Sequence, residues 1–165
     1  MTTTITQRSA LMVVFIVSLL TIIGAFLFQW AGYAPCPLCL QQRWAYYAVI
    51  PLSLIFAGID RSNAGIARWG LLLIALILIA NSIFGIYHAG AEWKFWPGPQ
   101  SCSGVGKVTA ADLNAFLEGA KVRGPSCEDA AWRFAGLSMA GWNALVSLGL
   151  AAMSVLSAIR ERAKI

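Results

Sequence analysis

The chain has 165 residues, of which 59% are hydrophobic and 12% are charged, and its formal net charge is +5. A mean hydropathy of +0.71 is typical of an integral membrane protein and excludes an ordinary soluble domain. The positive charges are scattered and the sequence holds no nucleotide-binding glycine motif. Neither feature indicates nucleic-acid binding, so we expect no nucleic-acid partner.

The first expected element is a transmembrane helix over residues 11–29. It lies in an uncharged stretch between Arg8 and Arg43, and about 20 apolar residues are enough to cross roughly 30 Å of hydrocarbon. A cleaved secretory signal also begins with a basic residue and an apolar run, but this run is too long and no convincing cleavage site follows it. We therefore expect a retained first helix.

The second expected helix, over residues 40–59, is the shortest. Its uncharged stretch runs only from Trp44 to Ile59, so the helix has to begin nearer Leu40 in order to span the bilayer. This places Arg43 in the first turn, at the depth of the lipid interface. Arg43 is therefore not expected to be a plain surface charge.

Two more long uncharged stretches predict helices over residues 69–87 and 135–158. The sequence thus predicts an all-α membrane protein, a four-helix transmembrane bundle forming a single domain over residues 1–165. Basic residues concentrate at both termini and in the middle loop, which places these parts on the cytoplasmic side. The two other loops, residues 30–39 and 88–134, are then extracytoplasmic.

All four cysteines lie in these two extracytoplasmic loops, at Cys36, Cys39, Cys102 and Cys127. An oxidising compartment favours disulfides, and four cysteines allow three pairings. Cys36 and Cys39 form a C-x-x-C motif, whose disulfide would close almost no chain and so would stabilise little. This favours redox chemistry over two structural disulfides. A zinc site is the other alternative, but one C-x-x-C with two separated cysteines is a weak ligand pattern, and we expect no metal.

The surroundings of Cys39 favour a reactive thiolate. A helix that begins near Leu38 to Leu40 would direct its free amides and its dipole at Cys39. Arg43 follows on the same helical face, and its guanidinium could stabilise the thiolate and donate to a carbonyl oxygen that gains negative charge. The carbonyls of a quinone fit this description. The alternative for Arg43 is a side chain that extends to lipid phosphates.

A family resemblance follows from four features: the segment Cys36-Pro37-Leu38-Cys39-Leu40-Gln41-Gln42-Arg43, the four spans, the later pair Cys102 and Cys127, and Trp132-Arg133-Phe134-Ala135-Gly136-Leu137 before the last span. Together they resemble the disulfide bond formation protein B (DsbB) family over nearly the whole chain. The most specific part is the C-x-x-C with arginine four residues on.

The resemblance implies a protein dithiol:quinone oxidoreductase of the bacterial inner membrane. Its partner would be a periplasmic thioredoxin-like thiol oxidase (DsbA-like), which would form a mixed disulfide with Cys102 and release Cys127. Cys127 would then attack Cys36 and free Cys39, which passes electrons to ubiquinone or menaquinone beside Arg43. Such an oxidase has a potential of about −120 mV, so a nicotinamide is too reducing to accept these electrons.

Two features of the long loop complete the expectations. His88 is the only histidine, and because the family often has one near this place, the resemblance implies a role in quinone binding or proton uptake. The alternative is a polar residue tolerated at a helix end. Between the loop cysteines, Thr109-Ala110-Ala111-Asp112 has the form of a capping box and predicts a short amphipathic helix that ends before Gly124-Pro125.

Two other functions compete with this interpretation. A vitamin K epoxide reductase-like quinone reductase carries its loop cysteines before its C-x-x-C, whereas here the C-x-x-C comes first. A membrane scaffold would use its disulfides only to brace its loops. Replacing Cys39 by serine separates the scaffold from the oxidase, because only the oxidase would lose its turnover.

Overall fold

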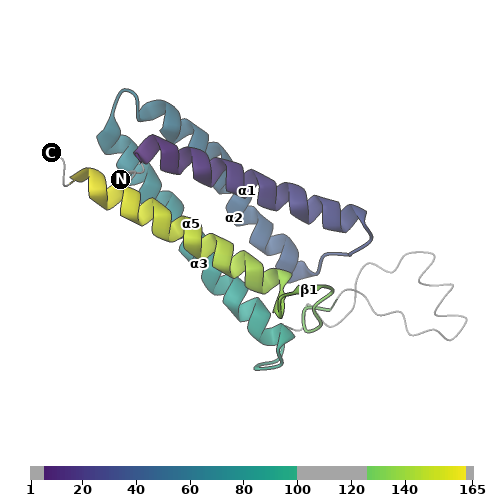
Figure 1. The fold of residues 1–165 in the computed structure, drawn as a ribbon. Coiled ribbons are helices and arrows are strands. Elements are labelled where there is room, and N and C mark those ends of the chain that lie inside the picture. Colours follow the sequence, from purple (N-terminus) through teal and green to yellow (C-terminus); the bar gives the residue numbers. More distant parts are fainter. Residues whose placement is uncertain (1–5, 100–125, 163–165) are drawn as a thin grey trace, which may run out of the picture.

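The computed structural model describes residues 6–99 and 126–162 (Figure 1). Within these ranges the secondary structure comprises α1 (Gln7–Trp30), α2 (Pro37–Ile59), α3 (Ala64–Glu92), β1 (Arg133–Phe134), β2 (Leu137–Ser138) and α5 (Met139–Arg162). The amphipathic helix expected between Cys102 and Cys127 lies outside the described residues.

Polar side chains define the starts of three helices. The Thr6 hydroxyl accepts the Ser9 amide at the start of α1, and the Asn63 side chain accepts the Ile66 amide at the start of α3. The sulfur of Cys36 takes the same place before α2, with Pro37 as the first helical residue. Each of these groups satisfies an amide that has no partner inside its helix.

The four helices run side by side as a bundle (Figure 1). Contacts join α3 to α5, α1 to α2 and α2 to α3. The start of α1, the α2–α3 turn and the end of α5 lie at one end, whereas the α1–α2 loop and the β1–β2 hairpin lie at the other. The segments that carry Cys36 and Cys127 therefore share the second end.

Three of the described helices are long and apolar enough to cross a membrane: α1, α3 and the part of α5 from Met139 to Arg160. The second expected span is not among them. Its helix α2 carries Gln41, Gln42 and Arg43 in its first two turns, and the charge of Arg43 is what made this span the shortest in the sequence. The four-span topology therefore stays a prediction.

The last helix begins later than expected. Residues 135–138 were predicted to be helical, but Ala135 and Gly136 have φ values of 51° and 82°. These positive values form a two-residue turn that pairs Phe134 with Leu137 in an antiparallel hairpin. The helix can start only after this hairpin, at Met139.

The other helices are longer than expected. α3 covers Ala64–Glu92 rather than 69–87, because charged residues at its ends do not interrupt its backbone hydrogen bonding. The long loop therefore begins after Glu92, and residues 88–92 belong to a helix. α1 begins at Gln7 and α2 at Pro37, each a few residues before the predicted start.

Candidate functional site

The dithiol pair is built by the start of α2. The sulfur of Cys36 accepts the backbone N–H of Cys39 at 3.3 Å, and the two sulfurs are 3.0 Å apart. Both residues are free thiols, and Cys36 is 3% exposed. The helix was expected to begin near Leu38 to Leu40 but begins at Pro37, so Cys36 is the capping residue and Cys39 lies in the first turn.

The two thiols are not equivalent. The Cys36 thiol donates its hydrogen to the sulfur of Cys39. This hydrogen bond and burial together raise the pKa of Cys36 above its usual value. The proton therefore stays on Cys36, and negative charge on the pair falls to Cys39.

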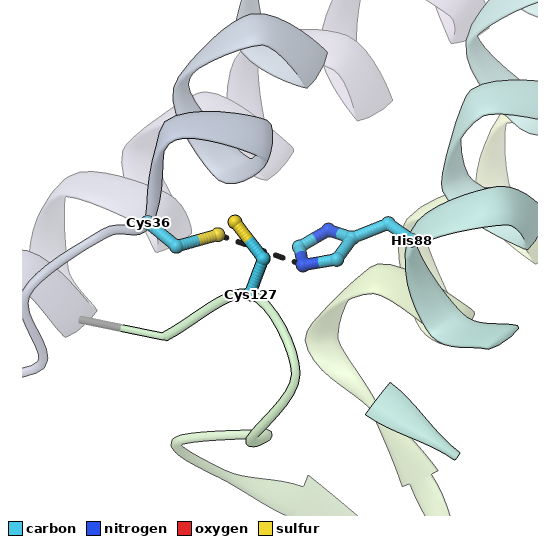
Figure 2. A group of neighbouring side chains, drawn as sticks. All are labelled: Cys36, His88 and Cys127. Atoms are coloured by element: carbon cyan, nitrogen blue, oxygen red, sulfur yellow. Dashed lines mark hydrogen bonds between the residues drawn. The ribbon is translucent and has the colours of Figure 1, made fainter. Parts of the chain in front are cut away.

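Two distant segments bring Cys127 and His88 to Cys36. Figure 2 shows the sulfurs of Cys36 and Cys127 turned toward each other, with the imidazole of His88 beside them. One sulfur of each cysteine and one ring nitrogen of His88 all lie within 4.8 Å of one another. Cys127 is disulfide-bonded, so it offers no thiolate here, and the cluster is no evidence for a metal. Cys102 lies outside the described residues.

His88 is part of the buried site and not a polar helix end. Its side chain is 1% exposed, and its Nε2 lies 3.5 Å from the sulfur of Cys36. Its other nitrogen, Nδ1, lies 2.8 Å from Nε2 of Gln42 on α2. Gln42 in turn accepts a hydrogen bond from Asn143 on α5. Three helices thus fix the plane of this ring.

The guanidinium of Arg43 points toward α1. It donates to Oε1 of Gln29 at 2.9 Å and to the carbonyl oxygen of Ala25 at 3.3 Å. It also stands over the ring of Phe26, 5.1 Å from the centroid. Arg43 is only 8% exposed, so its place is inside the bundle and not in an extended side chain at the surface.

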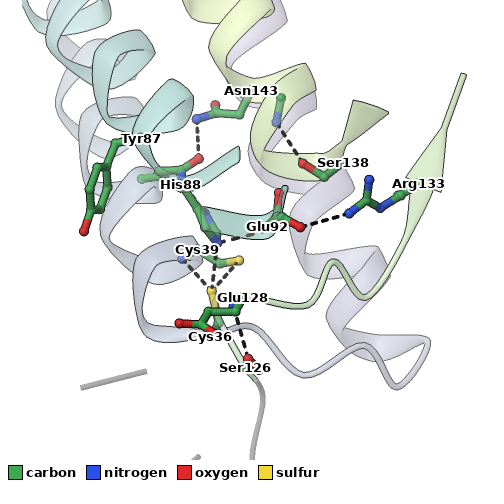
Figure 3. A network of polar contacts seen from close by, with 12 residues as sticks. Cys36, Cys39, Tyr87, His88, Glu92, Ser126, Glu128, Arg133, Ser138 and Asn143 are labelled. Atoms are coloured by element: carbon green, nitrogen blue, oxygen red, sulfur yellow. Dashed lines mark hydrogen bonds and ion pairs between the residues drawn. The ribbon is translucent and has the colours of Figure 1, made fainter. Parts of the chain in front are cut away.

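Glu92 is a member of the site that the sequence did not single out. It is 8% exposed, and its Oε1 lies 3.9 Å from Nε2 of His88 one helical turn earlier. Its Oε2 has no hydrogen-bond partner among the described residues. Arg133 of β1 donates to the backbone oxygen of Glu92 (Figure 3). The spacing of four residues from the only histidine was the signal that could have found it.

The thiols and Arg43 share a cavity of about 580 Å³ that is lined by residues of α1, α2, α3 and α5 and of the adjoining loops. This volume falls within the usual range for a small-molecule site. Most of its lining is apolar. Residues from α2 and α3 on its wall include Cys39, Gln42, Arg43, Tyr46, His88 and Glu92.

Ionic contacts hold the segment around Cys127 against the end of α3. The ammonium of Lys94 lies 3.1 Å from Asp129 and 3.7 Å from Glu128. The backbone N–H of Gly98 also donates to Glu128 at 2.8 Å. Figure 3 shows Glu128 next to Cys36, with Ser126 beyond it. These contacts position Cys127 near the dithiol.

Fold and site together define a helical membrane protein in which a partly buried dithiol and an arginine line one largely apolar cavity, with a disulfide-bonded cysteine beside the dithiol. Comparison with known proteins agrees with this class. The family model described as disulfide bond formation protein DsbB matches residues 7–157. The chain belongs to the DsbB family.

Several relatives carry the name disulfide bond formation protein B. The one from Methylococcus capsulatus is 34% identical over 139 residues, which cover 81% of this chain and 82% of that protein. The one from Albidiferax ferrireducens is 31% identical over 145 residues, covering 84% and 79%. The one from Azoarcus sp. is 28% identical over 137 residues, covering 81% and 80%. The chain is accordingly a membrane oxidoreductase of the disulfide-generating class, and the family resemblance is confirmed.

Proposed function

We propose that this protein reoxidises a periplasmic thioredoxin-like thiol oxidase of the DsbA kind and passes the electrons to a membrane quinone, ubiquinone or menaquinone. One observation carries the proposal: Cys127, Cys36 and Cys39 meet beside a cavity that Arg43 also lines. Sulfur atoms this close can exchange disulfides with only small movements of the chain. An adjacent apolar cavity gives a lipid-soluble acceptor a place to bind.

The first steps are thiol–disulfide exchanges. Following the family resemblance, a thiolate of the partner attacks Cys102 in a disulfide with Cys127, and Cys127 leaves as a thiolate. Cys127 then attacks Cys36 in the Cys36–Cys39 disulfide, so that a Cys36–Cys127 bond forms and Cys39 leaves as a thiolate. The second thiol of the partner resolves the mixed disulfide at Cys102, which releases the oxidised partner.

The last step reduces the quinone. Before it, Cys102 attacks Cys127 in the Cys36–Cys127 bond, so that the Cys102–Cys127 disulfide forms again and Cys36 is released beside Cys39. The Cys36–Cys39 dithiol then passes two electrons and two protons to the quinone through Cys39, which gives the quinol and forms the Cys36–Cys39 disulfide again. The net reaction converts a partner dithiol and a quinone into a partner disulfide and a quinol. The described structure holds one disulfide-bonded cysteine next to two free thiols, a two-electron-reduced state that this cycle contains.

Arg43 is the residue that we place at the quinone. A guanidinium keeps its charge at all working pH values and can donate to an oxygen that becomes negative during reduction. Its contacts with Gln29 and Ala25 fix it on the cavity wall. His88 is the second group that we place at this site, since it lines the same cavity.

For the membrane, we propose four spans in the bacterial inner membrane with both termini cytoplasmic and the cysteines periplasmic. α2 has 23 residues, which at 1.5 Å per residue reach roughly 34 Å, enough for the hydrocarbon core. The start of α1 and the end of α5 lie at one end of the bundle, and the start of α2, which carries the dithiol, lies at the other (Figure 1). Both features support this topology.

The test is quinone reduction by the purified protein supplied with a reduced DsbA-like oxidase, followed by absorbance. We expect turnover by the wild type, none by Cys39→Ser and a higher quinone requirement for Arg43→Ala. Arg61→Ala is the control, because Arg61 is an exposed arginine in the α2–α3 turn at the far end. If the wild type reduces no quinone with any such partner, the proposal is wrong and the scaffold function is favoured.

A further inference from the structure

The hydrogen bond between His88 and Gln42 determines which ring nitrogen of His88 carries the hydrogen. Nδ1 of His88 lies 2.8 Å from Nε2 of Gln42, and an amide nitrogen can only donate. Nδ1 therefore accepts this hydrogen bond. In a neutral imidazole the single ring hydrogen then sits on Nε2, the nitrogen that faces Cys36.

The neighbours of Gln42 fix the orientation of its amide. Asn143 donates its Nδ2 hydrogen to Oε1 of Gln42, so the nitrogen of Gln42 is left for His88. The oxygen of Asn143 faces two donors, the hydroxyl of Tyr46 at 2.6 Å and Nδ2 of Asn81 at 3.4 Å. Ser147 lies 2.9 Å from the Tyr46 hydroxyl and accepts a second hydrogen bond from Asn81.

This chain of donors and acceptors has one direction. It runs from Asn81 on α3 through residues of α5 and α2 and returns to His88 on α3. Gln42, Tyr46 and Asn81 are all buried, so losing a partner would leave a buried polar group unpaired, which is costly. Reversing one amide alone would bring two donors or two acceptors together, which makes the orientation cooperative.

We propose that Gln42 is a positioning residue that holds His88 as the neutral Nε2–H tautomer, so that His88 donates a hydrogen bond to the exchanging sulfurs and does not act as a general base. Nε2 lies 3.5 Å from the sulfur of Cys36. The sulfur of Cys127 belongs to the same group of atoms, all within 4.8 Å of one another. The tautomer follows from the hydrogen bonds alone, and its catalytic consequence rests on the proposed function.

The consequence concerns the exchange between Cys127 and Cys36. Negative charge starts on the sulfur of Cys127 and moves to Cys39 as the new bond to Cys36 forms. An N–H group directed at these sulfurs stabilises the thiolate in a buried site, whereas a bare nitrogen would repel it. Of the other charged groups, Glu92 on α3 lies 3.9 Å from Nε2, whereas Arg43 and Asp129 line the same cavity as the ring. Glu92 competes with the sulfurs for the same hydrogen.

The chain offers a direct test, because His88 is its only histidine. Protein labelled with ¹⁵N in histidine alone gives the signals of one ring, measured in detergent with the C-x-x-C pair reduced. Nε2 couples to both carbon-bound ring hydrogens, whereas Nδ1 couples strongly to one. We expect hydrogen on Nε2 and a bare Nδ1 at neutral pH. Hydrogen on Nδ1, or on both nitrogens, would overturn the proposal.

Two neighbouring glutamines supply matched variants. In Gln42→Glu the side chain can only accept while ionised, so we expect hydrogen to appear on Nδ1 and quinone reduction to fall by at least about tenfold. Gln41→Glu adds the same charge at an exposed position and should keep the wild-type tautomer and rate. Retention of the bare Nδ1 in Gln42→Glu would contradict the positioning role. A different outcome is also possible: the wild type could show the expected tautomer and yet reduce no quinone. That result would refute the proposed function but not the assignment of the tautomer.

Discussion

Arg43 on α2 donates a hydrogen bond to Oε1 of Gln29 on α1 at 2.9 Å. A second N–H group of the same guanidinium donates to the carbonyl oxygen of Ala25 at 3.3 Å, one turn earlier on α1. Because the guanidinium is planar, these two acceptors fix its plane as well as its position. Its charge is therefore held at one point of the cavity wall.

Arg43→Lys tests whether this fixed plane matters. Lysine keeps the charge but has a single flexible ammonium group, so it cannot serve both acceptors and also face a ligand in the same way. We expect KM for quinone to rise about tenfold with a smaller change in kcat, measured from initial rates over a range of quinone concentrations. An unchanged KM would show that charge alone is sufficient. Gln41→Leu, at an exposed position, is the control.

The unequal thiols predict an order of alkylation in the reduced protein. The raised pKa of Cys36 keeps it protonated at neutral pH, and only a thiolate is alkylated. We therefore expect a short pulse of iodoacetamide to label Cys39 first, and labelling of Cys36 to need a higher pH. Peptide mass spectrometry after pulses at several pH values measures both rates in one sample.

Cys127 provides the internal control for this experiment, because a disulfide-bonded cysteine is not alkylated. Faster labelling of Cys36 than of Cys39 would contradict the assignment of the proton. Labelling of Cys127 would instead mean that its disulfide had been reduced during preparation, and the order would then have to be measured again after reoxidation.

Much of the bundle could be predicted from sequence because uncharged runs of membrane length have few alternatives. The helices α1 and α3 cover the expected stretches, and the short uncharged run of the second span was visible from the position of Arg43. Polar side chains inside the apolar runs form hydrogen bonds between helices. Asn81 and Ser82 on α3 both contact α5, through Ser147 and the carbonyl oxygen of Ala144.

Residues of the site could be predicted from the sequence only where they belong to one short motif. The C-x-x-C and Arg43 lie within one helix start, so their spacing was informative. Gln42 and Glu92 were missed because their roles depend on burial against His88, which other helices provide. The hairpin before α5 was missed for a different reason: Ala135 takes a positive φ that alanine alone does not predict.

Gly85→Ala is expected to destabilise the bundle. A Cβ atom at Gly85 would lie 3.1 Å from the Cβ of Ala144 and 3.2 Å from the carbonyl oxygen of Ala140, both on α5. The backbone of α5 cannot turn away as a side chain can, so the two helices must separate at a cost of about 1–3 kcal/mol. Unfolding in detergent by heat or denaturant measures this change.

Gly149→Ala is the matched control, since a Cβ atom at Gly149 has no neighbour within 4 Å. Alanine favours the helix over glycine by up to about 1 kcal/mol, so this variant should be as stable as the wild type or more so. If Gly85→Ala and Gly149→Ala lost the same amount of stability, the close contact between α3 and α5 would be contradicted.

Lys94→Glu is expected to slow disulfide exchange by loosening the segment that carries Cys127. The variant replaces attraction to Asp129 and Glu128 by repulsion. The Lys94 and Asp129 side chains are more than half exposed, and such pairs contribute only about 0.2–1 kcal/mol each, so turnover should fall about two- to fivefold. Salt should reduce the difference in turnover between the variant and the wild type, because exposed charges are screened.

Arg61→Glu is the control, since it makes the same charge change at the far end of the bundle and should keep the wild-type rate. An equal loss of turnover in Arg61→Glu would assign the effect to net charge. The pair Lys94→Asp with Asp129→Lys should recover part of the rate, and a further loss in this double variant would contradict the ionic contact as the cause.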